Sequence, residues 1–527
     1  MIGQQKLVSC LLNKVRKAIS ILICLLLFSA GTPFAQKEGD IWVSGSGSIF
    51  FTFFQNDSVY NTHYVESDIN PPYSIQFGHG NTCINDSMGN LLFYSNGMSI
   101  LRKDYTLMEG GVQLAPDYYF LKKDGWSGYS QTSIILPVGK GIYYLFTPTC
   151  SDEQYHIWEM QSGNDSTFFD LFWYHIIDMN ANGGMGKVAQ SKIPLIENGY
   201  LGNTEMMAVR HANGRDWWLL KGRYNKGTND LIGYHTFLVS ANGVTEYGIQ
   251  YFPRIGQDYD WAIDGQCVFS PDGSMFATVT GHRGTINLFD FDRCSGILSN
   301  QRAIHVPRLP VDSVDLEWLT TVGIAFSPNQ QYIYVNGYTN IMQYELGESD
   351  SSKAWYWVNE NNQQGANFSN CYVGPNGKLY MGNWHGVGTT WCVINEPDKK
   401  GIACNYGNHS FQFPYFGATT PPCMPNFRLG ALAGSACDTL HAVEPPPNLA
   451  FMVYPNPAST TITIQYSNAS NTIFALYDMA GRTLFRTELP ATQNKVSIDV
   501  RSLASDVYTY KQIHHDISIQ TGKLLIQ

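Results

Sequence analysis

The stretch FSPDGSMFATVTG at residues 269–281 recurs, with changes, as FSPNQQYIYVNGY at 326–338 and VGPNGKLYMGNW at 373–384. In each copy, a turn rich in Pro, Asn, Asp and Gly precedes a run in which apolar or aromatic residues alternate with others. Asp-Gly and Asn-Gly favour the tight turns of β-hairpins. Alternation with period two is typical of a half-buried strand. Each copy therefore predicts a hairpin turn followed by a β-strand.

Earlier turns lead into LLFYSNG, IYYLFTP and WWLLKGRY, so six turns begin near residues 86, 137, 211, 270, 327 and 374. Additional strands follow, such as YHIIDMNANGG from Tyr174, YHTFLVSANG from Tyr234 and INLFDFDRCSG from Ile286. About four strands in every 40–60 residues, repeated six or seven times, is typical of a β-propeller. We therefore predict an all-β chain with a six- or seven-bladed propeller over residues 36–440. The opening strand from Gly39 is a candidate to complete the last blade.

The composition excludes several classes of protein. Aromatic residues make up 14% of the 527 residues and charged residues only 14%, which does not suit a coiled coil or a disordered tail. Residues 36–450 carry 23 bases against 38 acids. Because an acidic surface repels phosphate backbones, we expect no nucleic-acid partner.

The first 35 residues are typical of a secretory signal peptide. Lys14, Arg16 and Lys17 precede an apolar run from Ala18 to Ala30, and such a run is shorter than the ~20 residues of a comfortable membrane span. Cleavage after Ala35 is expected, with cleavage after Gly31 or an uncleaved anchor as alternatives. After cleavage, no stretch is long and apolar enough to form a stable transmembrane span.

Export would leave nine cysteines in a compartment where disulfides are allowed. An odd number leaves at least one thiol unpaired. Two pairs, Cys392 with Cys404 and Cys423 with Cys437, are close enough in sequence to be bridged within one loop, and buried free thiols are the alternative.

A Pro-rich linker at residues 441–450, which contains Glu444-Pro-Pro-Pro, precedes a final module at residues 451–527. Its short strands include TITIQY, IFALYD, TLFRTEL, KVSIDV and VYTYKQI. Their spacing and alternation predict a small Ig-like β-sandwich.

Two resemblances extend this interpretation. The FSPDG and FSPN copies resemble WD40-like and related secreted propellers, and residues 39–440 resemble propellers exported by Bacteroidota. The last module resembles the type A C-terminal sorting domain of the type IX (Por) secretion system. The residues that carry this second resemblance are Tyr454, Pro455, Asn456, Pro457, Gly522 and Lys523. It implies a partner, the type IX translocon, bound through residues 451–527, and delivery to the extracellular space or outer cell surface.

No motif for catalysis is present: the sequence lacks GxSxG, HExxH and a phosphate-binding loop. The run from Asp178 through Asn180 and Asn182 matches the first half of a calcium loop, but Ala189 stands where the bidentate carboxylate belongs. We interpret this run as a turn between blades. No catalytic, cofactor-binding or metal-binding residue is predicted, and no cofactor is expected.

Several polar residues beside glycines could line a channel or the loops of one face. The candidates are His79, Asp260, Asp264, His282 and His385. Such residues more often tie loops to neighbouring strands in the interior. Trp126, Trp217, Trp218, Trp355 and Trp357 would suit sugar stacking or blade packing, and we expect packing.

Two functions remain open. The favoured hypothesis is an exported propeller that binds an unknown protein or glycan ligand as an adhesin or scaffold. The alternative is a secreted hydrolase or lyase acting on polysaccharide or peptide at the channel mouth; a structural part of the secretion or gliding machinery is a weaker third.

Overall fold

The structure, a computed structural model, describes residues 37–44, 50–55, 58–64, 78–125, 127–160, 168–224, 231–255, 265–280, 284–307, 321–337, 340–359, 368–383, 390–413, 420–438, 451–466, 471–478, 481–514 and 517–527. The chain forms two compact units, residues 1–438 and 439–527, which we describe separately. The predicted signal peptide, at residues 1–35, and the linker, at 441–450, fall outside the described residues.

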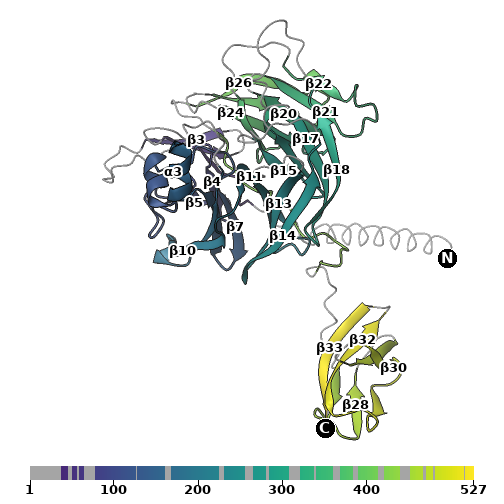
Figure 1. The fold of residues 1–527 in the computed structure, drawn as a ribbon. Helices are drawn as coiled ribbons and strands as arrows, with labels where there is room; N and C mark the ends of the chain where they lie inside the picture. Colours follow the sequence, from purple (N-terminus) through teal and green to yellow (C-terminus); the bar gives the residue numbers. More distant parts are fainter. Residues whose placement is uncertain are drawn as a thin grey trace, which may run out of the picture. The chain divides into compact units, whose positions relative to one another are not determined.

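The first unit is built from seven antiparallel sheets within its described residues (Figure 1). The first two sheets have three strands each: β1 (Trp42–Ser44), β2 (Phe50–Gln55) and β3 (Ser58–Tyr64), then β4 (Thr82–Asn85), β5 (Leu91–Ser95) and β6 (Ile100–Arg102). The next two have four strands each: β7 (Ile134–Gly139), β8 (Ile142–Thr149), β9 (Leu171–Asp178) and β10 (Lys187–Ile196), then β11 (Leu201–Arg210), β12 (Trp217–Arg223), β13 (Leu231–Ser240) and β14 (Gly243–Pro253).

Three more four-stranded sheets follow in chain order. They comprise β15 (Cys267–Phe269), β16 (Met275–Thr280), β17 (Thr285–Asp292) and β18 (Ile297–His305); β19 (Thr321–Phe326), β20 (Tyr332–Gly337), β21 (Ile341–Glu345) and β22 (Trp355–Trp357); and β23 (Phe368–Val373), β24 (Leu379–Asn383), β25 (Thr390–Ile394) and β26 (Tyr406–Gln412). The short helices are α2 (Asp117–Lys122), α3 (Asp152–Met160), η1 (Asn182–Gly184) and η3 (Gly401–Cys404).

These sheets confirm the predicted propeller fold, and the described residues of the first unit form seven of them. The six turns expected from the sequence each join the first strand of a sheet to its second strand. In the turn from β15 to β16, Gly273 has φ +74°, and the Asp272 carboxylate accepts a hydrogen bond from the backbone N–H of Ser274 at 2.9 Å. A positive φ and a carboxylate acceptor are what the Asp-Gly pair supplies.

The first strands are tied to one another across sheets. Gln266 accepts hydrogen bonds from the backbone N–H groups of Ile324 and Cys371 at 3.2 and 2.9 Å, so one side chain joins three sheets. Gln131 exchanges two hydrogen bonds with the backbone of Cys267, at 2.8 and 2.9 Å. Buried amides that bond to backbone groups fix the relative position of the sheets around the axis.

Residues 420–438, which we call the clasp, close the ring. Thr420 lies beside Ser44, whose hydroxyl donates to the Thr420 carbonyl at 3.3 Å, and Arg428 pairs with Asp40 at 2.8 Å. The clasp therefore runs antiparallel to β1, and it also contacts the residue before β4, where the Cys423 N–H donates to the Asn81 carbonyl at 2.8 Å.

The prediction that the opening strand completes the last blade is wrong. The sheet that begins with β23 already has four strands, and β1 starts a separate sheet with β2 and β3. The N-terminal and C-terminal segments of the propeller instead meet side by side at the sheet formed by β1, β2 and β3.

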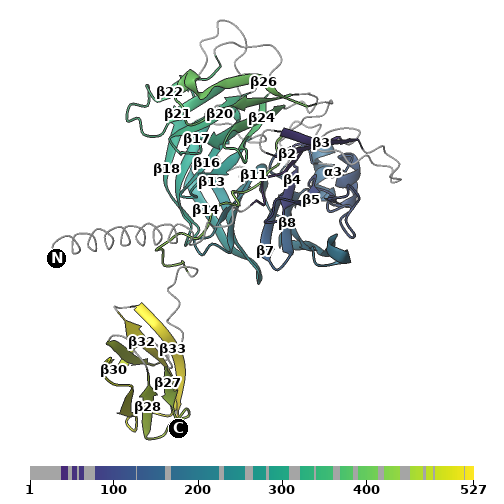
Figure 2. The same cartoon turned by 180° about the vertical axis from the view of Figure 1, so that it is seen from behind.

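The antiparallel order of the strands separates two faces of the ring. Turns between first and second strands, and between third and fourth strands, lie on one face, which we call the turn face. Connections between second and third strands, and from one sheet to the next, lie on the opposite face, which we call the loop face. Both α2 and α3 belong to connections of the loop face (Figure 2).

The second unit is a two-sheet β-sandwich, as predicted. One sheet has the order β27 (Met452–Tyr454), β28 (Thr461–Gln465), β31 (Lys495–Asp499). The other has the order β30 (Thr483–Leu489), β29 (Thr472–Tyr477), β32 (Asp506–His514), β33 (Ile517–Ile526). A core that includes Ile462, Ile464, Phe474, Leu476 and Leu524 lies between them.

Candidate functional site

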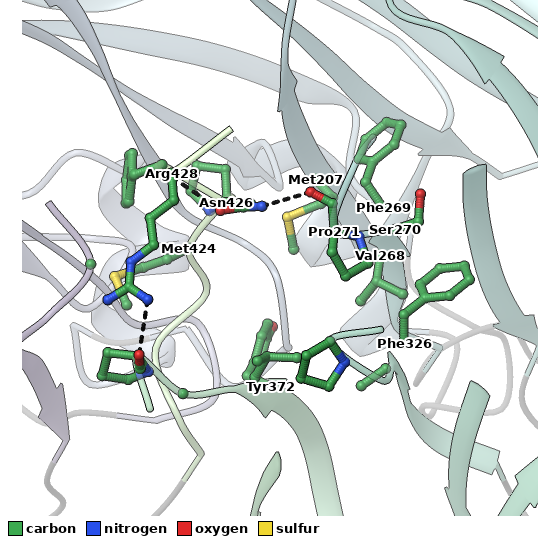
Figure 3. A pocket seen from close by; sticks show the side chains of 18 of the residues that line it. Met207, Val268, Phe269, Ser270, Pro271, Phe326, Tyr372, Met424, Asn426 and Arg428 are labelled. Atoms are coloured by element: carbon green, nitrogen blue, oxygen red, sulfur yellow. Dashed lines mark hydrogen bonds between the residues drawn. The ribbon is translucent and has the colours of Figure 1, made fainter. Parts of the chain in front are cut away.

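A cavity of about 340 Å³ opens at the turn face, where four first strands end (Figure 3). Its walls come from β1, β11, β15, β19 and β23, from the turns that follow the last three, and from the clasp. The apolar lining includes Phe269, Phe326, Tyr372, Met424 and Phe427. Phe326 and Phe427 are nearly inaccessible to solvent, which fixes the floor of the cavity by packing.

Polar groups stand at the rim of this cavity. The Asn426 amide donates to the carbonyl of Pro271 at 2.9 Å, and Arg428 donates to the carbonyl of Pro375 at 2.9 Å. The second guanidinium nitrogen of Arg428 forms the ion pair with Asp40. These contacts hold the rim in place and neutralise its cation, so the cavity is apolar with a fixed polar edge.

The clasp is held at its far end by a disulfide between Cys294 and Cys437, which are 143 residues apart. Of the two possibilities left open by the sequence, neither candidate bridge forms. Cys392, Cys404 and Cys423 are buried and form no disulfide, and burial raises the pKa of Cys423 to about 12. The clasp separates its own two cysteines, because Cys423 lies against the start of β4 while Cys437 reaches the turn between β17 and β18.

A second cluster lies inside the ring between β11, β12 and β16. The Lys221 ammonium is fully buried and donates to the carbonyls of Gly202, at 2.6 Å, and of Thr204. The Thr278 hydroxyl donates to the Glu205 carboxylate. Burial raises the pKa of Glu205 above its ordinary value and lowers the pKa of Lys221 to about 8.

Glu205 is held in an unusual backbone conformation. Its φ of +59° lies in the left-handed region, which costs an ordinary side chain roughly 1–2 kcal/mol, and the pairing of β11 with β12 is irregular between Leu201 and Met206. A Cβ added to Gly222 would lie 2.4 Å from the Glu205 carboxylate, so glycine provides room for this side chain. The positive φ of Glu205 and the irregular pairing around it together place the Glu205 carboxylate against Thr278 of the neighbouring sheet.

Of the five polar candidates from the sequence, His79 lies in the described part of the chain. It precedes β4 at the loop face, where the Thr420 hydroxyl donates to its carbonyl at 3.5 Å. Asp260, Asp264, His282 and His385 lie outside the described residues, in the connections β14–β15, β16–β17 and β24–β25. The site role of all five stays a prediction.

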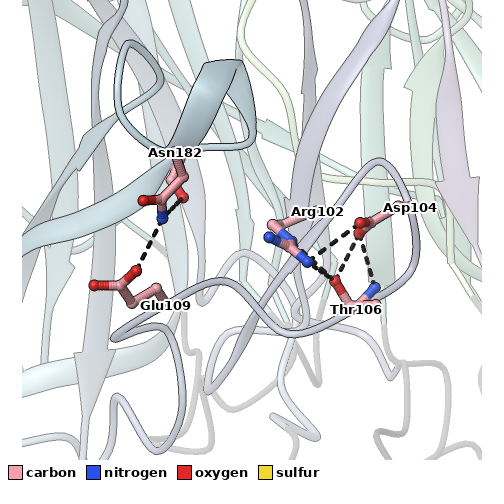
Figure 4. Close-up of polar contacts among 6 residues, drawn as sticks. Arg102, Asp104, Thr106, Glu109 and Asn182 are labelled. Atoms are coloured by element: carbon pink, nitrogen blue, oxygen red, sulfur yellow. Dashed lines mark hydrogen bonds and ion pairs between the residues drawn. The ribbon is translucent and has the colours of Figure 1, made fainter.

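The half-match to a calcium loop forms a hairpin turn between β9 and β10, within one sheet and not between blades as expected. Asp178 accepts hydrogen bonds from the backbone and side chain of Asn180 at 2.9 and 3.0 Å. The Asn182 amide donates to Glu109 at 2.9 Å and to the Gly186 carbonyl at 3.1 Å (Figure 4). In the described parts of the chain, no group of three or more His, Cys, Asp or Glu residues could hold a metal ion.

Tryptophan packing accounts for two of the five candidates for sugar stacking. Trp217 and Trp218 are buried, and their indole N–H groups donate to the carbonyls of Pro137, at 3.0 Å, and Arg293, at 2.9 Å. Trp355 and Trp357 are partly exposed on β22, and Trp126 lies outside the described residues.

Sequence reasoning missed Glu205, Lys221, the polar rim and the partner of Cys437. A signal existed for Lys221, because WWLLKGRY places a lysine inside an apolar strand. Burying such a charge requires partners. The rim residues of the clasp had no such signal, because the sequence PNFR at residues 425–428 is typical of an ordinary loop.

Comparison with known proteins identifies the second unit. Residues 452–527 match the family of secretion system C-terminal sorting domains. The match confirms the expected type IX sorting domain, which marks the chain for export to the cell surface or extracellular space. No curated protein sequence matches the chain. Among described residues, no helix is long and apolar enough to cross a membrane.

Solved structures resemble the chain at low identity. The periplasmic gluconolactonase of Pseudomonas aeruginosa is 12% identical, with 72% of this chain and 97% of that chain covered and a TM-score of 0.39. A structure described as the extracellular domain of a hybrid two-component system of Bacteroides thetaiotaomicron is 11% identical, covering 94% and 58%, with a TM-score of 0.36. A β-propeller domain from Myceliophthora thermophila is 10% identical, covering 61% and 84%, with a TM-score of 0.28.

Proposed function

We propose that this chain is an exported binding protein, an adhesin or scaffold, whose propeller holds a protein or glycan partner. The observation that carries the proposal is the apolar cavity of about 340 Å³ at the turn face. A concave apolar site with a few fixed polar groups is typical of ligand binding. In this proposal, residues 1–35 are the signal peptide, 441–450 the linker and 451–527 the module engaged by the translocon.

The chemistry of the cavity supports binding over hydrolysis. Arg428 is the lining residue with a permanent charge, and it is already paired with Asp40. An acid/base mechanism needs carboxylates or a histidine at the reacting bond, and the lining contains neither. An aliphatic or aromatic side chain of a protein partner suits these walls better than a sugar, whose hydroxyls would need several polar contacts.

One observation favours the alternative, a secreted hydrolase or lyase. Glu205 has a raised pKa, and a Cβ on Gly265 would lie 3.6 Å from its carboxylate. Gly265 directly follows the connection that contains Asp260 and Asp264. A perturbed carboxylate next to such a connection is a candidate acid or base.

The experiment is a screen of peptide and glycan arrays with the purified full chain, with and without EDTA, in which substrate turnover is measured on the same samples. Val373, 40% exposed at the cavity, is changed to Glu, and Ile402, 72% exposed in η3, is changed to Glu as the matched control. Saturable binding that V373E weakens about tenfold and I402E leaves unchanged supports the proposal. Substrate turnover that Glu205→Gln abolishes would contradict the proposed binding function and support the enzyme instead.

A further inference from the structure

Two motif residues of the sorting domain, Asn456 and Gly522, have structural roles inside their own sandwich. The Asn456 amide donates to the Lys523 carbonyl at 2.8 Å and accepts from the Leu525 N–H at 2.9 Å. A Cβ on Gly522 would lie 2.3 Å from the Tyr510 hydroxyl oxygen, so glycine is required beneath this ring. These residues hold the end of β33 to the start of the domain, which is a structural task.

Exposed apolar side chains mark surfaces through which a domain contacts other proteins. Among the described residues 451–527, the large apolar side chains that are well exposed are Tyr454 at 38%, Leu484 at 43% and Phe485 at 36%. Tyr454 has local partners: its hydroxyl donates to Gln465 at 3.1 Å, and the Lys495 ammonium lies 6.0 Å from the centre of its ring. Leu484 and Phe485 are neighbours on β30, so the unexplained apolar exposure of the domain is concentrated on this strand.

β30 is also an open edge of its sheet. It pairs with β29 on one side, and no other described strand pairs with its outer side. Residues Thr483–Arg486 are all exposed, so this segment buries neither of its faces within the unit. An exposed apolar edge strand is a template for pairing with another chain, which folded proteins normally avoid.

The other edges of the sandwich expose fewer large apolar side chains among the described residues. On β31, the exposed residues are Lys495, Ser497 and Asp499, none of which is apolar, and the short edge strand β27 exposes Tyr454, whose ring and hydroxyl have the local partners described above. At the end of β33, Ala458 donates its N–H to the Leu525 carbonyl and accepts from the Gln527 N–H, both at 2.8 Å. Among the described residues of the domain, β30 is the edge strand with two adjacent, well-exposed large apolar side chains, Leu484 and Phe485.

We infer that β30 is the docking edge for the type IX translocon, which adds an extended strand of its own beside Thr483–Glu488. The occupant follows from the family match, because a sorting domain must be recognised by the secretion machinery. Strand addition supplies main-chain hydrogen bonds, and side chains on alternate positions give specificity. The incoming strand carries apolar residues against Leu484 and Phe485.

The test is export of the full chain from a bacterium that has the type IX system. Leu484→Lys with Phe485→Lys is compared with Ser497→Lys on the edge strand β31, which also adds positive charge at an exposed edge. In parallel, a photo-crosslinking amino acid replaces Phe485 or Ser497, and adducts are identified by mass spectrometry. Thermal unfolding of each purified variant establishes that the domain folds.

We expect the double variant to fold normally, to be exported about tenfold less and to accumulate in the periplasm, while S497K is exported as the wild type. Adducts with translocon subunits are expected from position 485 and not from position 497. Normal export of the folded double variant would overturn the proposal, as would translocon adducts from position 497 alone. If the double variant misfolds, the presence or absence of translocon adducts from position 485 decides whether the proposal holds. The result does not depend on what the propeller binds.

Discussion

Breaking the bond between Cys294 and Cys437 tests whether the clasp closes the propeller. The proposed change is Cys294→Ala with Cys437→Ala, and the alternative perturbation is reduction of the wild-type chain with dithiothreitol. The other described cysteines are buried and form no disulfide, so reduction should act on this bond alone within the described part of the chain.

The magnitude follows from the length of the closed loop. The two cysteines are 143 residues apart, and the chain-entropy relation gives about 5 kcal/mol for a loop of this size, with measured values more often 2–4 kcal/mol. An unfolding entropy of about 2.1 cal/mol/K per residue gives roughly 0.8 kcal/mol/K for a propeller of about 400 residues. The expected decrease in Tm is therefore about 3–6 °C.

The local effect separates this explanation from a general loss of stability. The Leu432 N–H donates to the Ala212 carbonyl at 2.9 Å near the disulfide, whereas the Cys423 N–H is bonded deep in the ring. Without the covalent bond, the outer clasp opens while the inner clasp stays packed. Amide hydrogen exchange should become faster at Leu432 and change much less at Cys423.

The assays are differential scanning calorimetry and hydrogen exchange, each with and without reductant. The wild type should lose stability on reduction, and the double variant should show the lowered Tm already and not respond further. An unchanged Tm together with unchanged exchange at Leu432 would refute the clasp as the closing element. A continued response of the double variant to reductant would mean that another disulfide carries the effect.

Three further results are expected from single substitutions. Lys221→Met should remove a pH dependence of stability, because the folded chain loses the Lys221 proton near pH 8 and the unfolded chain near pH 10.5. Between pH 8 and 9, the unfolding free energy of the wild type should therefore rise by about 1 kcal/mol relative to that of the variant. Denaturant titrations that show the same difference at both pH values would contradict this. Gly273→Ala should lower the unfolding free energy by about 2 kcal/mol or more, because its φ is +74° and the new Cβ would lie 2.8 Å from carbons of Arg293 and Val209. Gly184→Ala, with φ +88° and no atom within 4 Å of its Cβ, should lower it by about 1 kcal/mol in the same assay. Equal losses would show that packing around Gly273 does not matter. Asn456→Ala should destabilise the sorting domain by about 1–2 kcal/mol, because it removes the hydrogen bonds to Lys523 and Leu525. An unchanged unfolding transition of that domain would show that Asn456 has no structural role.

The parts of the fold that could be predicted are those that neighbouring residues encode. The Asp272-Gly273 pair favours a tight turn whatever surrounds it, and the alternation in MFATVT selects a strand. The same reasoning failed for the cysteines, because sequence separation says little about which strands become neighbours. It failed for the calcium-like run because a hairpin within a sheet and a turn between sheets use the same residue types.

The sequence by itself determined the repeated hairpins, the all-β class and the sorting domain, since each depends on residues within a few positions or on a contiguous motif. Only the tertiary structure decided that the clasp runs beside β1 and meets the start of β4, that Cys294 meets Cys437, and that Glu205 and Lys221 share a buried cluster. These contacts join segments up to almost 400 residues apart, and such pairings are selected by the packing of the whole ring. The cavity belongs to this second group, because five sheets and the clasp form its walls together.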